Sequence, residues 1–132
     1  MGITEDGREE AVLLSGNSLT GLKISAINIG SGTTAFDPAD TSLETPVDFE
    51  GALDAAVSTS DATVMEIQAT FTDNDATINE AGMVCQDDPT NDTQTSKNAA
   101  DTQFSRQTVP EVNLLSTDKL DVTFELQMLN ST

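Results

Sequence analysis

Apolar and polar residues alternate along three stretches of the chain. The clearest alternation lies near the C-terminal end, where every second residue is apolar: Leu120, Val122, Phe124, Leu126 and Met128. Segments 47–57 and 65–71 show the same period of two. Successive side chains of a β-strand point to opposite sides, so this pattern is typical of strands with one buried face and one wet face. We therefore predict strands at all three places.

Three further segments complete the predicted sheets. Residues 22–29 are apolar on both faces, which indicates a strand that is largely buried. After the turn residues 73–75 (DND), segment 78–85 is a shorter strand candidate, and segment 104–109 is another. About six strands with hairpin-length or longer connections favour a mainly β fold, a single antiparallel β-sandwich that is jelly-roll-like.

The N-terminal segment, residues 1–17, has the pattern of one short helix. Asp6 is followed three residues later by Glu9, which is typical of a helix N-cap with its reciprocal partner. By contrast, residues 86–101 contain almost no apolar side chain and are predicted to form a long, exposed acidic loop. No repeat and no linker divides the sequence, so we expect a single domain that spans residues 1–132.

Charge changes this picture more than any motif does. The chain carries 23 acidic and 5 basic side chains, a formal net charge of −18. Such a surface repels nucleic acids and anionic membranes, so we expect neither as a partner. Self-repulsion lowers stability, and salt screens it over a Debye length that falls from about 8 Å at physiological ionic strength to about 3 Å at 1 M. We therefore hypothesise that the protein works in concentrated salt. One alternative is an acidic protein that works at ordinary ionic strength. The other is a disordered acidic segment, and the periodic apolar residues disfavour disorder.

Other general features indicate a soluble product of the cytoplasm. The first residues lack the basic start and apolar core of a secretory signal. No run reaches the ~18 apolar residues of a membrane span. The single cysteine, Cys85, excludes an internal disulfide.

Candidate chemistry is sparse. Residues 30–32 (GSG) follow a predicted strand, as a phosphate-binding loop does, but no helix follows them and no Gly-Lys-Ser or Gly-Lys-Thr occurs. The chain has no histidine, the commonest general base, and acidic neighbours make Cys85 a poor nucleophile. Carboxylate pairs have almost no specificity among 23 acids. We expect no enzyme activity and no cofactor.

Divalent metal is the one ligand that the acidic side chains suggest. Residues 73–77 place oxygen ligands at alternate positions as a calcium loop does, but Ile78 and Val84 stand where such a loop needs glycine and glutamate. The cluster in residues 87–92 offers carboxylates as well. We interpret both as solvated acidic loops and predict no metal site, with these weak candidates: Asp73, Asp75, Asp87, Asp88 and Asp92.

Several segments together resemble a known family of proteins. Residues 4–11 (TEDGREEA), 29–35 (IGSGTTA) and 40–44 (DTSLE) are similar to the opening of small tail-fibre-like appendage proteins of tailed viruses. That family has an N-terminal "G-R" helix, a strand, a "G-x-G-T-T-A-P" turn and a "D-T-x-L" segment.

The later parts of the family pattern follow in the same order. Residues 69–71 (ATF) with 78–83 (INEAGM) resemble its "A-T-F … I-x-E-A-G-L/V", and residues 104–106 (FSR) and 118–126 (DKLDVTFEL) resemble its "L-A-R" and "D-x-L-x-V-T-W-x-L" strands. The resemblance covers nearly the whole chain. Two departures are a phenylalanine at position 124, where the family often has tryptophan, and a longer, more charged acidic loop.

The resemblance implies a structural role for the glycine loop. Gly30 and Gly32 are expected to leave the strand with positive φ, local hydrogen bonds of Thr33, Thr34 and Asp37 to hold the loop, and Pro38 to fix its exit. The loop would turn a corner between strands. We also expect contacts between subunits at the loops 30–43 and 86–101, with three short-helix residues and three loop residues as attachment or interface candidates: Val12, Leu13, Leu14, Gly30, Gly32 and Phe36.

The resemblance and the charge together predict a non-enzymatic virion protein of a tailed virus that infects a halophilic archaeon. Such a subunit is made in the host cytoplasm and then assembles with identical copies and other virion proteins, as a tail or baseplate appendage or as a capsid-surface decoration such as a turret. The alternative is a module that binds a glycan receptor on the host cell surface, although the chain lacks Tyr and Trp, the usual stacking platforms for sugars.

Overall fold

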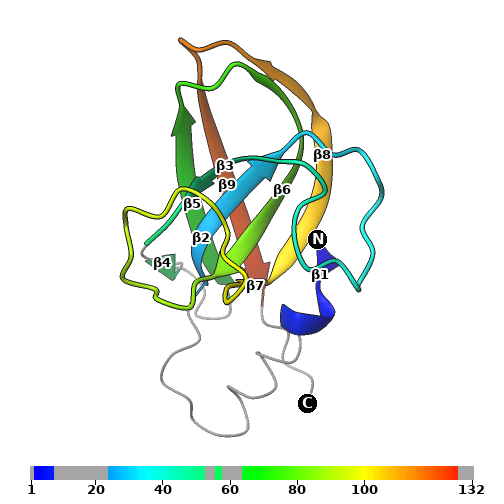
Figure 1. Ribbon diagram of the computed structural model, residues 1–132, viewed down its shortest axis with the longest axis vertical. Helices are drawn as coiled ribbons and strands as arrows, with labels where there is room; N and C mark the ends of the chain where they lie inside the picture. Colours follow the sequence, from blue (N-terminus) through cyan, green and yellow to red (C-terminus); the bar gives the residue numbers. More distant parts are fainter. Residues whose placement is uncertain (1, 8–23, 53–55, 58–63, 128–132) are drawn as a thin grey trace, which may run out of the picture.

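The computed structural model describes residues 2–7, 24–52, 56–57 and 64–127. Within these residues the chain is mainly β, with a short helical turn near the N-terminus and strands that pair antiparallel (Figure 1). The interface candidates Val12, Leu13 and Leu14 lie outside the described residues. The strands are β1 (Gly2–Ile3), β2 (Ile24–Gly30), β3 (Pro46–Glu50), β4 (Ala56–Val57), β5 (Val64–Thr72), β6 (Ala76–Cys85), β7 (Thr102–Gln103), β8 (Ser105–Leu114) and β9 (Lys119–Gln127).

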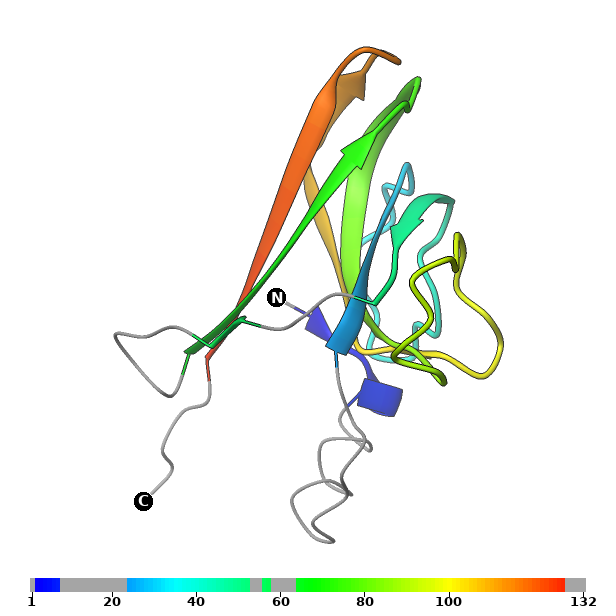
Figure 2. The same ribbon diagram turned by 90° about the vertical axis from the view of Figure 1, so that its left-hand side faces the viewer.

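The strands form two sheets, as the sequence predicts for a β-sandwich. The larger sheet has the order β1-β8-β6-β2-β3, with β7 paired to β6, and the smaller has the order β4-β5-β9. The chain crosses between the sheets after β3, after β5 and after β8. Figure 2 shows the sheets meeting at the end where the β5–β6 and β8–β9 turns lie, and diverging toward the other end.

The core lies between the two sheets and follows the predicted alternation. On β5, Ile67 and Phe71 are buried, whereas Glu66, which precedes Ile67, is exposed to solvent. Phe124 of β9 is also buried and stands opposite Ile67 in the register of the two strands. Burying each of these large side chains contributes roughly 1.5–3 kcal/mol. Both sheets contribute to one apolar cluster: Ile24, Ile27, Ile29, Ile67, Ala69, Phe71, Ile78, Ala81, Met83, Cys85, Phe104, Leu114 and Phe124.

Strand β2 is buried along its whole length, which confirms the prediction for a segment that is apolar on both faces. Ile27 and Ile29 belong to the core between the sheets. Ala26 belongs to a second, smaller cluster with Phe49 and Val84. β2 therefore contributes apolar side chains to two separate clusters.

The predicted single strand 47–57 is wrong, because two strands in different sheets occupy it. β3 ends at Glu50, and Ala52 has a φ of 56°, a left-handed conformation that an extended strand does not contain. The N–H of Ala52 donates to the side-chain oxygen of Gln86 at 2.8 Å, which holds the chain in this bend. β4 then begins in the smaller sheet.

Two other boundaries also differ from prediction. β8 is longer than the predicted strand 104–109 and continues through Pro110 to Leu114. The register between β8 and β6 shifts at Asn79, next to Pro110, which indicates a β-bulge. A bulge tolerates proline because the residue there does not need to donate an N–H to the neighbouring strand. The helix begins at Glu5, and its N-cap is Thr4, whose hydroxyl accepts from the N–H of Gly7 at 2.9 Å. Asp6 is therefore not the N-cap.

Candidate functional site

The glycine loop binds a carboxylate, and that carboxylate belongs to the protein itself. Glu80 of β6 is fully buried. Its Oε1 accepts from the N–H groups of Gly32 at 3.1 Å and Thr45 at 2.8 Å. Its Oε2 accepts from the N–H of Glu44 at 3.0 Å and from Nε of Arg106 at 2.8 Å. Phosphate-binding loops also surround an anion with backbone N–H groups. Here the anion is the Glu80 carboxylate, and its hydrogen bonds hold residues 31–45 against the sandwich.

Arg106 of β8 is the second half of this network. Its side chain is 2% exposed, and Nη1 lies 3.0 Å from Oδ2 of Asp40. Nη2 donates to the carbonyl oxygen of Thr34 at 2.7 Å. Burial by itself would lower the pKa of Arg106, but the hydrogen bonds and charges of Glu80 and Asp40 outweigh it and raise the pKa above its usual value. Arg106 is therefore a permanent buried cation that joins β6, β8 and the loop.

The two glycines are needed for space and not for backbone conformation. No described glycine has a positive φ, so that expectation for Gly30 and Gly32 is wrong. A Cβ on Gly30 would collide with the carbonyl oxygen of Thr45 and lie 2.5 Å from Oε1 of Glu80, and one on Gly32 would lie 2.7 Å from the same oxygen. Both glycines are buried, so they shape the loop and do not present a surface. The loop joins the adjacent antiparallel strands β2 and β3, which confirms that it turns a corner.

Local hydrogen bonds hold the outer part of the loop. Oδ1 of Asp37 accepts from the N–H of Ala39 at 2.9 Å, as predicted for this turn. Oε1 of Glu44 accepts from the N–H of Thr33 at 3.0 Å, and a side-chain hydrogen bond from Thr34 helps to lower the pKa of Glu44. Phe36 is half-buried, and its ring lies directly over Gly2 of β1.

The acidic loop 86–101 is exposed in its middle but anchored at both ends. Its end residues Gln86 and Asp101 are buried, which corrects the prediction for these two positions. The side-chain nitrogen of Gln86 donates to the carbonyl oxygen of Asn91 at 3.0 Å. Oδ1 of Asp101 accepts from the N–H of Asp87 at 2.8 Å, and Oδ2 accepts from that of Asn98 at 2.8 Å. These bonds fold the loop back on itself.

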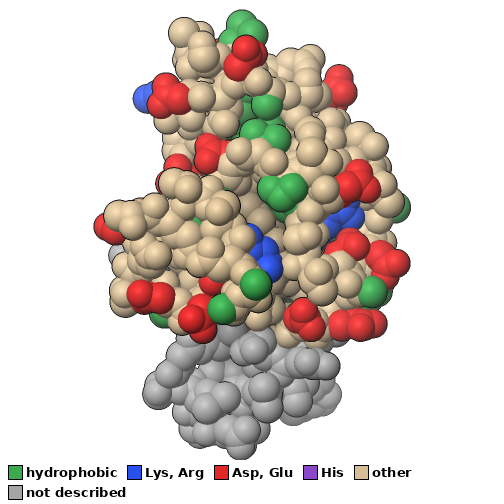
Figure 3. Space-filling model, viewed as in Figure 1, with side chains coloured by type: hydrophobic (Ala, Val, Ile, Leu, Met, Phe, Trp, Pro, Cys, Tyr) green, Lys and Arg blue, Asp and Glu red, His purple; other side chains and the backbone are tan. Residues whose placement is uncertain are grey.

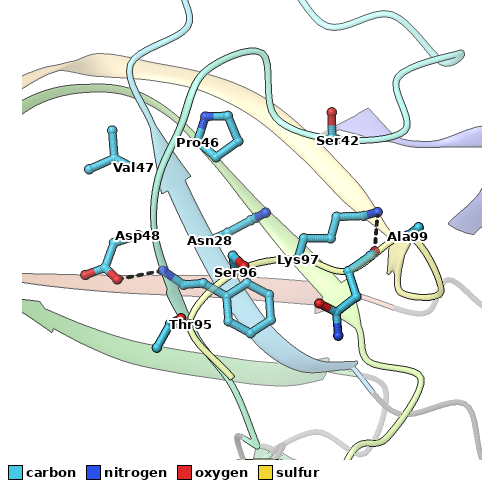
Figure 4. Close-up of a pocket in the computed structure, with 11 residues that line it drawn as sticks. Asn28, Ser42, Pro46, Val47, Asp48, Thr95, Ser96, Lys97 and Ala99 are labelled. Atoms are coloured by element: carbon cyan, nitrogen blue, oxygen red, sulfur yellow. Dashed lines mark hydrogen bonds between the residues drawn. The ribbon is translucent and has the colours of Figure 1, made fainter. Parts of the chain in front are cut away.

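The two loops predicted to make contacts lie on either side of one cavity of about 330 Å³ (Figure 4). Ser42 and strand β3 form one wall, and segment 95–99 forms the other. The side chain of Lys97 runs along this second wall toward Ala99, with Nζ donating to the carbonyl oxygen of Asn98 at 3.2 Å. Figure 4 also shows the amide of Asn28 projecting from β2 into the same space. The lining residues are Asn28, Ser42, Pro46, Val47, Asp48, Phe49 and 95–99.

The metal candidates are divided between two separate parts of the molecule. Asp73 and Asp75 lie in the exposed β5–β6 turn, whereas Asp87, Asp88 and Asp92 are exposed on the acidic loop. In the described part of the chain, no three or more His, Cys, Asp or Glu side chains are grouped closely enough to hold a metal ion. Asp88 instead accepts from the hydroxyl of Thr90 at 2.7 Å, which lowers the pKa of its carboxyl.

Cys85 is buried at the end of β6 within the apolar cluster. No helix among the residues described here has the length and apolar character required to cross a membrane. Comparison of the chain with protein-family models, curated proteins and solved structures found no match.

Proposed function

We propose that the protein is a non-enzymatic structural subunit of the virion of a tailed virus that infects a halophilic archaeon. It acts by assembling with identical copies and docking onto other virion proteins, as an appendage of the tail or baseplate or as a decoration of the capsid surface. Two independent features support this proposal. They are the place of the family-like segments in the fold and the charge of the surface.

The observation that carries the proposal is that family-like segments far apart in the sequence meet in one buried network. Segment 29–35 supplies the N–H of Gly32, and segment 40–44 supplies Asp40 and the N–H of Glu44. Segments 78–83 and 104–106 supply the central ion pair, Glu80 and Arg106, at 2.8 Å. The resemblance therefore coincides with the contacts that hold the loop on the sandwich, which favours a shared fold over a chance similarity of short motifs.

The acidic surface supports a high-salt environment. Figure 3 shows Asp and Glu side chains spread over the visible face, with few Lys or Arg between them. On the outer face of the smaller sheet, Glu66 and Glu125 are exposed and stand directly opposite each other in register. Like charges that stand directly opposite each other on neighbouring strands are destabilising in ordinary salt. Concentrated salt would screen this repulsion.

The loop 31–45 is the described surface that we assign to contacts between copies. Residues 31–39 include one charged side chain, Asp37, in a chain whose net charge is −18. Ala35 and Ala39 are exposed there. The buried Glu80–Arg106 pair fixes the loop in advance, so association would lose little conformational entropy at this surface. Segment 12–14 remains our proposed attachment point to the particle.

Light scattering after size exclusion in about 3 M NaCl tests this assembly. The Debye length is already about 3 Å at 1 M, so repulsion between acidic surfaces is screened at this salt concentration. We expect a defined trimer, pentamer or hexamer. Ala35→Glu and Ala39→Glu add charge to the loop surface and should dissociate it, whereas Thr117→Glu in the exposed β8–β9 turn should not. A monomer at every concentration, or an oligomer that ignores both loop variants, would contradict the proposed role of this surface.

A further inference from the structure

An apolar groove of about 330 Å³ lies between β8 and β9. β8 belongs to the larger sheet and β9 to the smaller, so the groove runs along one side of the sandwich. Val109, Val112, Leu120 and Val122 line it and are only half-buried. We propose that the groove binds an extended segment of another protein as one more strand beside β9, in which apolar residues alternate with lysine or arginine. The proposal does not involve the loop 31–45 and so does not rest on the assembly proposed above.

The outer edge of β9 is suited to pairing with a further strand. Among the described residues β9 pairs with β5 alone, and the register of the two strands has no shift. An unpaired edge presents a row of N–H and C=O groups on which another strand can form. The edge of β8 is less suitable, because it contains Pro110 and its register with β6 shifts at Asn79. β9 contains no proline, so we assign the added strand to β9.

The two faces of β9 determine which side chains the added strand needs. Leu120, Val122 and Phe124 pack in or against the core on the inner face. Side chains of the added strand that point the same way would lie beside them in the groove, where apolar residues gain most from burial. Asp121 and Glu125 are exposed on the opposite face. Side chains directly opposite each other on neighbouring strands are about 4.5–5.5 Å apart, so the other half of the added strand would stand beside two carboxylates.

Charge selects a basic partner for this edge. On its β5 side Glu125 stands opposite Glu66, which has the same charge. A lysine or arginine on the other side of Glu125 would offset this repulsion, because opposite charges on neighbouring strands stabilise a sheet. Asp121 accepts from the hydroxyl of Thr70 at 2.6 Å and keeps further lone pairs for a second donor. A second copy of this chain is a poor occupant, because its net charge of −18 adds repulsion.

Titration of the full chain with synthetic peptides tests the site, in the lowest NaCl concentration at which the protein remains folded. The probe is a labelled peptide of alternating lysine and valine, as long as β9, and binding is followed by fluorescence anisotropy. One control peptide has glutamate in place of lysine. The other keeps every lysine but has proline in place of valine, so it retains the charge and cannot pair its backbone with β9. We expect saturable binding of the lysine–valine peptide and much weaker binding of both controls.

Amide hydrogen exchange and two variants locate the bound peptide. Exchange should slow at every second amide of residues 119–125, whose N–H groups point away from β5, and stay unchanged on β3, the edge strand of the larger sheet.

Glu125→Lys should weaken binding of the lysine–valine peptide roughly tenfold, because an attractive pair becomes a repulsive one. Asp87→Lys makes the same kind of charge change on the exposed acidic loop and should leave the affinity nearly unchanged. Equal affinity for the proline peptide, or equal effects of the two variants, would show non-specific attraction and overturn the proposal. Slow exchange at the same amides in the protein alone would also overturn it, because the edge would then already be covered, as by a second copy.

Discussion

Replacing Glu80 by glutamine is the most direct test of what holds the long loop in place. The change keeps the shape of the side chain and removes its charge. The wild-type carboxylate accepts from Gly32, Glu44, Thr45 and Arg106 with its two oxygens. A glutamine retains one acceptor oxygen and turns an NH₂ group toward the other donors. Either orientation therefore leaves buried donors facing a donor.

The magnitude follows from the charge that is left behind. Arg106 remains 2% exposed, and Asp40 is then its one anionic partner among the described residues. Removing one partner of a buried ion pair costs about 3–5 kcal/mol, because the other charge stays desolvated. For a chain of this size a loss of 1 kcal/mol lowers the unfolding midpoint by roughly 4 °C, so we expect a fall of about 10–20 °C. The loop should loosen before the sandwich unfolds, because its donors are released first.

The assay is thermal unfolding followed by circular dichroism, with amide hydrogen exchange as the local readout. Exchange at Gly32 and Thr45 should accelerate more than exchange on β5 and β9. Glu66→Gln is the matched control, because Glu66 is exposed and faces the like charge of Glu125; it should be neutral or slightly stabilising. A loss of less than about 1 kcal/mol in Glu80→Gln, the size of an ordinary hydrogen bond, would refute our view that the ion pair secures the loop.

Three further outcomes are expected. The unfolding midpoint should rise between about 0.1 M and 3 M NaCl, because salt screens repulsions such as that between Glu66 and Glu125; an unchanged midpoint would contradict adaptation to salt. Gly32→Ala should destabilise the loop and speed amide exchange at Thr45, because the added Cβ would lie 2.7 Å from the buried carboxylate; unchanged exchange would show that the network tolerates a shift. Burial, and to a lesser extent the charge of Asp48, raise the pKa of Glu50. The Glu50 carboxyl therefore binds its proton more tightly in the folded state than in the unfolded state. For this reason the free energy of unfolding decreases as pH rises above about 4.5. Glu50→Gln should therefore stabilise the protein at pH 7 and lose this advantage below pH 4.5, as denaturant titrations at both pH values would show; an equal effect at both would exclude the ionised carboxyl as the cause.

The strands that alternate strictly could be predicted from the sequence, because each has one face in a single core. Ile67 and Phe71 of β5 and Phe124 of β9 are buried, and their polar neighbours are exposed, as the period of two requires. Burial of β2 on both faces also followed from its composition. These predictions need only the local sequence and the fact that apolar surface leaves water.

Changes of sheet could not be predicted in the same way. Segment 47–57 keeps its period of two in the sequence across the bend at Ala52, although β3 and β4 belong to different sheets. The bend depends on Gln86, which is 34 residues away and holds the N–H of Ala52. A hydrophobic pattern records which face is buried, but it does not record the sheet to which a strand belongs.

The buried network did leave a signal in the sequence, in two charges rather than in the glycines. Glu80 and Arg106 stand inside segments predicted to be strands, and a charge in a buried strand requires a partner. The glycine loop is similar to a phosphate site because its N–H groups do converge on an anion. Those groups are already used: Ser31 donates to the carbonyl oxygen of Thr45, Gly32 to Glu80, and Thr33 to Glu44. A phosphate would have to displace a buried carboxylate paired with Arg106, and so the same chemistry that makes the loop similar to a nucleotide site argues against its binding one.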